Sequence, residues 1–326
     1  MGQVRGWRCG LHCGLHCGLA AWLMLTPAVA VARGRDALEY PMNVVVLVSD
    51  DQRWDSLGAA GNDVIRTPRL DKLVEEGVHF TDAFVTTSIC MSSRASILTG
   101  QLTSRHGITR FNREIEPDAF SETYPAVLRQ AGYWTGFVGK YGVGDVRQED
   151  FDFAPHAQDG HPRQYLPQDW SAEFYEGVRI GPTPKGEKHF RALPEFIQQK
   201  NNVARIRYYW RFDTPERYQD YMTRYYRLIT EVDEAVGRLM DELKAQGVYE
   251  NTLIVFIGDN GYFQGDRLLA GKWYPYEESI RVPMIVHDPR LQADPTEKYN
   301  LVDDPHYDHV LETMRQRMQT LCEEQK

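Results

Sequence analysis

A cysteine and an arginine four residues apart are the first candidates for chemistry in this sequence. Cys90 directly precedes a segment, Ser92 to Leu98, that we predict to be helical, and Ser92 or Ser93 is a candidate cap. Backbone N–H groups and the dipole favour an anion at a helix N-terminus, so a nucleophile there is well supported. Arg94 adds a guanidinium fork suited to an oxyanion. The alternative is a buried free cysteine, which is the usual state of a lone thiol.

Oxygen-rich side chains follow two strongly apolar segments. Residues 43–48 and 252–257 are β-branched runs that predict buried strands, the first of them a central and parallel one. The first run is followed by Asp50 and Asp51, and the second by Asp259 and Asn260. Open α/β sheets place ligands at the C-terminal ends of strands, and adjacent carboxylates repel unless a cation lies between them. Such oxygen ligands suit Ca²⁺ or Mg²⁺, whereas solvated turns are the alternative.

The segment from Cys90 to Gly100 reads Cys-Met-Ser-Ser-Arg-Ala-Ser-Ile-Leu-Thr-Gly. It resembles the signature of the sulfatase family, Cys-x-(Pro/Ala/Ser)-x-Arg followed at a fixed distance by Leu-Thr-Gly. In that family the cysteine is oxidised during biosynthesis to formylglycine, an aldehyde whose hydrate attacks the sulfur of a sulfate ester. The resemblance implies a sulfuric ester hydrolase that acts on a sulfated small molecule or polysaccharide. It also implies a formylglycine-generating enzyme as the partner that modifies Cys90.

The resemblance assigns expected roles to further residues. The expected metal ligands are Asp50, Asp51, Asp259, Asn260 and the modified Cys90, with Ca²⁺ expected rather than Mg²⁺. Lys140 and Lys272 match two lysines that contact the sulfate, and Arg94 is expected to favour the nucleophilic oxygen. His156, in an Ala-Pro-His context, matches a histidine that protonates the leaving alcohol. Gly142 stands where many family members carry another histidine.

An α/β scaffold must bring these residues together. Strand-like runs alternate with predicted helices, including a long amphipathic helix from Thr214 to Gln246. The resemblance implies an alkaline phosphatase-like fold, with a large, mostly parallel mixed sheet flanked by helices. We expect a shortened catalytic domain at residues 40–290 and a remnant C-terminal segment at 291–326 that contains a terminal helix. The small antiparallel C-terminal subdomain of the family is expected to be reduced or absent.

Parts of the family scaffold are expected to be missing. Only about a dozen residues separate Lys140 from His156, which is too few for a crossover helix and a further strand. We therefore expect this interval to lack both elements. Loss of the small subdomain, which would cover part of the large sheet, is expected to leave an apolar edge or face exposed. The basic and aromatic stretch from Asn201 to Trp210 is interpreted either as a sugar-stacking platform or as a packed loop.

The bulk composition is that of an exported globular protein. The 326 residues are 42% hydrophobic and 25% charged, and the net charge of −9 disfavours nucleic acid as a partner. Residues 1–32 resemble a signal peptide whose apolar run is too short for a stable membrane span. Its removal would leave only Cys90 and Cys322, which make no disulfide framework. We therefore expect a periplasmic or secreted protein of bacterial type.

Two other functions remain open at this point. The first is a degenerate, catalytically impaired sulfatase homologue, or the product of a faulty gene model, because segments are missing. The second is a phosphate-ester hydrolase on the same fold. Such enzymes usually carry Ser or Thr as the nucleophile, so Cys90 within its full signature argues against this alternative.

Overall fold

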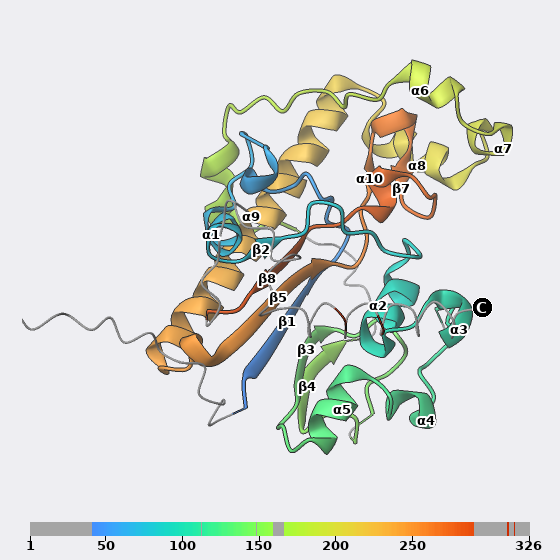
Figure 1. Ribbon diagram of the computed structural model, residues 1–326. Helices are drawn as coiled ribbons and strands as arrows, with labels where there is room; N and C mark the ends of the chain where they lie inside the picture. The colour runs from blue at the N-terminus through green and yellow to red at the C-terminus, as the bar shows by residue number, and fades with distance from the viewer. Residues whose placement is uncertain are drawn as a thin grey trace, which may run out of the picture. The chain divides into compact units, whose positions relative to one another are not determined.

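The computed structural model describes residues 41–111, 113–147, 149–158 and 166–289, together with residues 312 and 316 (Figure 1). The predicted signal peptide and, apart from the helical residues 312 and 316, the C-terminal segment lie outside the described residues. Residues 42–326 belong to one compact unit. Within the described ranges, no helix is long and apolar enough to cross a bilayer.

A four-stranded mixed sheet lies at the centre of the fold. Its strand order is β1 (Asn43–Ser49), β5 (Thr252–Gly258), β8 (Met284–His287) and β2 (Val78–His79). β1 runs parallel to β5, whereas the pairs β5–β8 and β8–β2 are antiparallel. The prediction of a central strand at 43–48 is wrong in one respect. β1 lies at the sheet edge and is mostly half-buried, because no described strand pairs with its other side.

The helices α1 and α9 pack on this sheet. α1 (Pro68–Glu76) begins with proline in its first turn, where the missing N–H costs nothing. α9 (Pro215–Ala245) is the predicted amphipathic helix. Their apolar faces meet the inner side chains of β5 and β8 in one buried cluster. That cluster includes Leu70, Leu73, Val236, Met240, Ile254, Phe256 and Ile285.

Shorter elements surround the sheet and carry the connecting loops. The 3-10 turns are η1 (Gly58–Ala60), η2 (Asp169–Tyr175), η3 (Tyr249–Asn251) and η4 (Asp266–Leu268). The remaining helices are α2 (Cys90–Thr99), α3 (Thr103–His106), α4 (Pro117–Phe120), α5 (Tyr124–Gln130), α6 (Glu187–Arg191), α7 (Glu195–Gln198), α8 (Val203–Arg211) and α10 (Glu277–Ile280). The strands β6 (Phe263–Gln264) and β7 (Ala270–Gly271) form a small hairpin. The basic and aromatic stretch is therefore mostly the helix α8 rather than a loop.

A second, two-stranded sheet carries the other predicted site residues. β3 (Gly136–Lys140) pairs in parallel with β4 (Phe153–Gln158). The expectation that no strand precedes His156 is wrong, because β4 contains this residue opposite Val138. The connection between the two strands holds no helix in its described residues, as expected.

Apolar surface is left uncovered between the two sheets. A cavity of about 250 Å³ is lined by alternate valines of β1 and by residues 136–138 of β3. Trp134 and Val138 are 70% and 69% exposed, which is unusual for side chains of this type. No pairing joins β3 to β1 among the described strands, so the free edge of β1 lies open beside this cavity.

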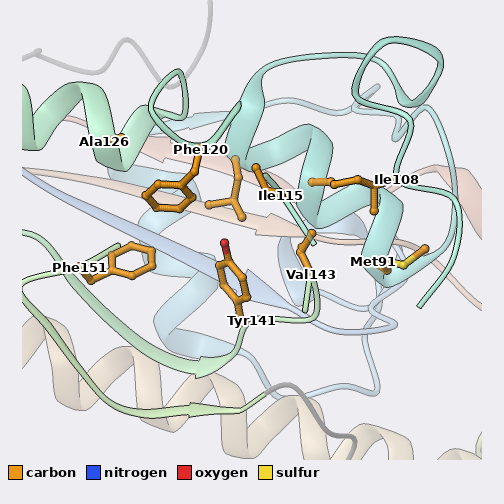
Figure 2. Packing of buried hydrophobic residues seen from close by; sticks show 10 residues of the cluster. Met91, Ile108, Ile115, Phe120, Ala126, Tyr141, Val143 and Phe151 are labelled. Atoms are coloured by element: carbon orange, nitrogen blue, oxygen red, sulfur yellow. The ribbon is translucent and has the colours of Figure 1, made fainter. Parts of the chain in front are cut away.

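An aromatic cluster fixes α2 against the end of β3. Met91, Ala95 and Leu98 of α2 are among its buried members. Figure 2 shows the rings of Phe120, Tyr141 and Phe151 close to one another, and Tyr141 and Phe151 have centroids 6.4 Å apart. Tyr141 directly follows Lys140, so this packing sets the position of that lysine relative to α2.

Candidate active site

Cys90 is the first residue of α2 and is only 2% exposed, with its thiol free. The prediction that Ser92 or Ser93 caps the helix is wrong. The N-cap residue is Ile89, which makes no side-chain cap, and the Ser92 hydroxyl donates to the carbonyl of Ile108 at 2.8 Å. The helix begins two residues earlier than predicted, so both serines lie inside its first turn. Cys90 therefore lies where backbone N–H groups favour an anion.

The acidic residues converge at the ends of β1 and β5. The register pairs Ser49 with Gly258, so the two parallel strands end level with each other. One carboxylate oxygen from each of Asp50, Asp51 and Asp259 lies within 4.8 Å of the others. The Asp51 N–H donates to Asp259 Oδ1 at 3.2 Å, and Asp51 has a φ of 54°, which aspartate tolerates.

Asn260 and Lys272 extend this cluster. The Asn260 amide donates to Asp51 Oδ1 at 2.6 Å. The ammonium group of Lys272 donates to the same Asp51 oxygen at 2.5 Å and to Asn260 Oδ1 at 3.1 Å. Both donor residues are buried, whereas the side chain of Asp51 that accepts from them is 36% exposed. Asn260, which follows β5, and Lys272, which follows β7, thus both contact Asp51, which follows β1.

Arg94 and Lys140 bring two further positive charges to Asp259 and Asp50. Arg94 Nε donates to Asp259 Oδ2 at 2.8 Å, and Nη1 donates to the backbone carbonyl of Lys140 at 2.6 Å. Arg94 Nη2 also lies 3.7 Å from Asp50 Oδ2, and the Lys140 ammonium pairs with that same oxygen. Three cations thus surround three carboxylates, and Arg94 links β5 to β3.

The charges shift one another's protonation. Burial raises the pKa of Asp259 to about 6, and the neighbouring charge of Asp50 adds to this effect. Burial also opposes ionisation of Asp50, but the charges of Lys140 and Lys272 outweigh it and hold the pKa of Asp50 below its ordinary value. For Lys272, burial would lower the pKa, but the charges of the carboxylates, that of Asp51 first, raise it above its ordinary value.

The acidic cluster has the chemistry of a divalent-cation site. Carboxylate and amide oxygens are the hard ligands that Ca²⁺ and Mg²⁺ prefer. Burial, with the charge of Asp50 added to it, raises the pKa of Asp259, and a shared cation would offset both effects. Asp50, Asp51, Asp259 and Asn260 therefore fit a metal ion by type and by convergence.

The structure describes the surroundings of Gly142 but only the backbone of His156. Gly142 has a φ of 76°, and a Cβ there would lie 3.0 Å from Arg94 Cδ and 3.5 Å from Lys140 Cε. A histidine at this position would strain the backbone and crowd both cations, so the glycine suits the local packing. His156 lies in β4 opposite Val138, but its side chain falls outside the described part of the structure.

Sequence reasoning missed three residues that hold the site together. The carbonyl and hydroxyl oxygens of Ser88 accept the Trp273 N–H at 3.3 and 3.2 Å, and its hydroxyl lies 2.8 Å from that of Ser279. These contacts hold the Lys272 segment against the turn before Cys90. Tyr225 of α9 lies with its hydroxyl 3.4 Å from the Asp51 carbonyl. In the sequence, Ser88 stands out only because it lies two residues before Cys90, and Ser279 only because it lies within the segment at 276–283.

The whole described unit matches a known family. The family model named Sulfatase matches residues 42–165 and 148–311. An N-acetylgalactosamine-6-sulfatase from Canis lupus familiaris is 27% identical over 315 residues, which cover 81% of this chain and 60% of that protein. An N-acetylglucosamine-6-O-sulfatase from Bacteroides thetaiotaomicron is 23% identical, with coverage of 76% and 63%. The chain thus spans less than two thirds of the length of these relatives.

Solved structures have the same α/β fold, of the alkaline phosphatase type. One is BT4656 in complex with its substrate D-glucosamine-2-N,6-O-disulfate. It is 21% identical with a TM-score of 0.61, and the match covers 76% of this chain and 71% of that one. Another is a phosphonate monoester hydrolase of Agrobacterium radiobacter, 19% identical with a TM-score of 0.55 and coverage of 76% and 68%. With its sheet, its signature helix and the family model matched from residue 42 to 311, the chain belongs to the sulfatase family.

Proposed function

We propose that this protein hydrolyses sulfate esters of carbohydrates through a nucleophile made from Cys90. The observation that carries the proposal is the position of Cys90 at the N-terminus of α2, the helix whose Arg94 donates to Asp259 Oδ2 at 2.8 Å. Conversion of Cys90 to formylglycine supplies an aldehyde hydrate as the nucleophile. The names of the relatives support a sulfated hexosamine as the substrate class.

We infer that Ca²⁺ binds at Asp50, Asp51, Asp259 and Asn260, with position 90 as a further ligand. When bound, the ion favours the ionised form of the nucleophilic oxygen. The buried Asp259 is held in place by Arg94, which donates to its Oδ2 at 2.8 Å. Arg94 therefore orients a ligand as well as adding positive charge near position 90.

The two lysines have the chemistry to hold the sulfate group. Lys140 and Lys272 project toward the carboxylates from the ends of β3 and β7, and their flexible stems allow them to turn toward an anionic substrate. Positive charge at the sulfate oxygens stabilises the charge that is held through the transfer. His156 is proposed to protonate the leaving alcohol, because an imidazole can release a proton near neutral pH.

The central test is the substitution Cys90→Ala. We expect it to lower kcat for an aryl sulfate and for N-acetylglucosamine 6-sulfate by several orders of magnitude, on the order of 10⁴ or more. Mass spectrometry of the unsubstituted protein should find the aldehyde at position 90. Cys322→Ala, which removes the other cysteine outside residues 1–32, is the matched control. Turnover retained in Cys90→Ala would sink the proposal.

A phosphate- or phosphonate-ester hydrolase is the second candidate, because a solved phosphonate monoester hydrolase has the same fold. Parallel assays with aryl sulfate, aryl phosphate and phenyl phosphonate separate the two functions. Faster turnover of the phosphorus esters would favour the second. A protein that responds to Ca²⁺ but turns over none of the three esters would be the degenerate homologue. Export of the chain remains a prediction from residues 1–32.

A further inference from the structure

Helix α8 carries two guanidinium groups on one face beside the candidate active site. Arg207 and Arg211 are four residues apart, so they lie one above the other on the helix surface. The Arg207 guanidinium lies 4.5 Å from the centroid of the Trp273 ring. Arg211 Nη1 donates to the Tyr262 hydroxyl at 3.1 Å. Figure 1 shows α8 next to β7, against which it packs.

The residues that the two arginines contact are neighbours of the site in sequence and in space. Trp273 directly follows Lys272, and Tyr262 comes two residues after Asn260. The Tyr262 phenol is buried, which raises its pKa, and it feels the charges of Arg211, Asp51 and Arg207. The positive charges on α8 are therefore within electrostatic range of the acidic cluster.

The backbone around Trp273 is held in an unusual conformation. Trp273 has a φ of 86°, which is rare for a bulky residue and persists only where the surroundings enforce it. Its ring lies over Gly271, where a Cβ would come within 2.6 Å of a ring carbon. Its N–H is held by Ser88. This fixed ring supports the guanidinium plane of Arg207 beside Lys272.

Among the described residues, no acidic side chain forms an ion pair with Arg207 or Arg211, and both arginines are half-buried. Arg205 of the same helix differs, since it is buried and donates to the Leu268 carbonyl and the Tyr209 hydroxyl. Arg205 therefore serves packing, whereas its two neighbours keep N–H donors for a ligand.

We propose that Arg207 and Arg211 bind a second oxyanion of the substrate, a sulfate or a carboxylate carried by the same saccharide. Two guanidinium forks on a rigid helix match the oxygen atoms of either group. The inference rests on the proposed function, in which the scissile sulfate lies on Lys140 and Lys272. The protein is then selective for saccharides that carry at least two negative groups.

Binding to the full chain carrying Cys90→Ala, in the presence of Ca²⁺, tests this inference without turnover. Calorimetric titration compares N-acetylglucosamine 6-sulfate with two dianionic probes. One is glucosamine 2-N,6-O-disulfate, and the other is a 6-sulfated hexosamine joined to a uronate. We expect at least one dianionic probe to bind roughly tenfold or more tightly than the monosulfate. Tighter binding of the first probe identifies the second oxyanion as sulfate, and tighter binding of the other identifies it as carboxylate.

The substitutions Arg207→Gln and Arg211→Gln should each remove most of that preference, by roughly tenfold. Arg224→Gln is the matched control, because Arg224 is an exposed arginine of α9 that pairs with Asp220. If a glutamine variant fails to melt cooperatively, Arg207→Lys and Arg211→Lys retain the charge but lose the fork, and should weaken the preference partially.

Unchanged preference in the variants, equal weakening for all three saccharides, or no binding of any of them would overturn the inference. The proposed function is judged separately, by turnover of N-acetylglucosamine 6-sulfate with Cys90 intact. Turnover without any preference for dianions leaves the function standing and removes the second subsite. A preference that depends on the arginines, without turnover, keeps the subsite and removes the function.

Discussion

The candidate site has an acidic side, made of Asp50, Asp51, Asp259 and Asn260, and a basic side, made of Arg94 and Lys140. Different interactions hold these two sides in place. Asp50 and Asp259 follow β1 and β5, whose ladder aligns Ser49 with Gly258 and whose inner side chains are buried. Lys140 ends β3, which belongs to a separate two-stranded sheet. Its described links to the acidic side are the Arg94 bond to its carbonyl and the ion pair with Asp50.

This difference predicts different responses to change. A backbone ladder backed by a buried core holds Asp50 and Asp259 whatever their charge state, because it depends on burial and on hydrogen bonds away from the site. The link to Lys140 depends on charged groups and so responds to substitution and to a bound ion. We therefore expect a preformed cation site and a sulfate contact that adjusts when ligands bind.

The largest difference in stability should be between substitutions at a buried position of the central sheet and at an exposed position of the two-stranded sheet. Phe256 of β5 is 1% exposed, so Phe256→Ala should lower the free energy of unfolding by about 3–5 kcal/mol. Val138 of β3 is largely exposed, so Val138→Ala should change it by less than about 0.5 kcal/mol. Urea unfolding measures both. Similar losses in the two variants would mean that Val138 is buried in the folded protein, contrary to its exposure here.

Lys140→Gln tests whether the basic side can fail alone. Removing a positive charge from the sulfate should lower kcat by about 10²–10³-fold. The Ca²⁺-dependent rise in melting temperature should persist, because the β1–β5 ladder, and not the ion pair of Lys140 with Asp50, positions the proposed ligands. Lys72→Gln, at an exposed lysine of α1 that pairs with Glu76, is the matched control. Loss of the Ca²⁺ response in Lys140→Gln would contradict the division into two sides.

Asp259→Asn tests the acidic side in the opposite way. Ca²⁺ at a hundred times its dissociation constant should raise the free energy of unfolding by roughly 2.7 kcal/mol. The substitution should remove most of this rise, because it takes one negative charge from the centre of the cluster. Asp220→Asn, at an exposed carboxylate of α9, serves as the control. Thermal melts with and without Ca²⁺ measure this stabilisation. If Ca²⁺ stabilises Asp259→Asn as much as the unsubstituted protein, the ion binds elsewhere.

The smallest effect concerns the support of α2. His106 Nδ1 accepts the N–H of Ile108 at 3.0 Å, which requires a neutral ring, and Nε2 lies 3.0 Å from the Ser96 hydroxyl. Burial lowers the pKa of His106 below its ordinary 6.5. The unfolded chain therefore takes up the proton first, so this stability is present above about pH 6.5 and is lost as the pH falls through the folded pKa.

Urea unfolding at about pH 7.5 and about pH 5 measures the effect of His106. The unsubstituted protein should lose more stability between these values than His106→Gln does, because glutamine does not titrate. An equal loss in both proteins would show that other groups cause the pH dependence.

The sequence by itself identified the chemistry and the strongest local elements. The apolar runs at 43–48 and 252–257 are strands followed by carboxylate and amide side chains, and the segment from Cys90 contains the helix of the family signature. The long helix ending near Gly247 was equally visible. These features are local, because residue type and periodicity over a few residues decide them.

The tertiary structure decided what depends on distant partners. α2 begins at Cys90 rather than at the serines, because Met91 and Ala95 pack on the aromatic cluster. β1 became an edge strand because no described segment pairs with its free side. α8 brings Arg207 and Arg211 to residues more than fifty positions away. Packing and register between remote segments set all of these, and no local pattern encodes them.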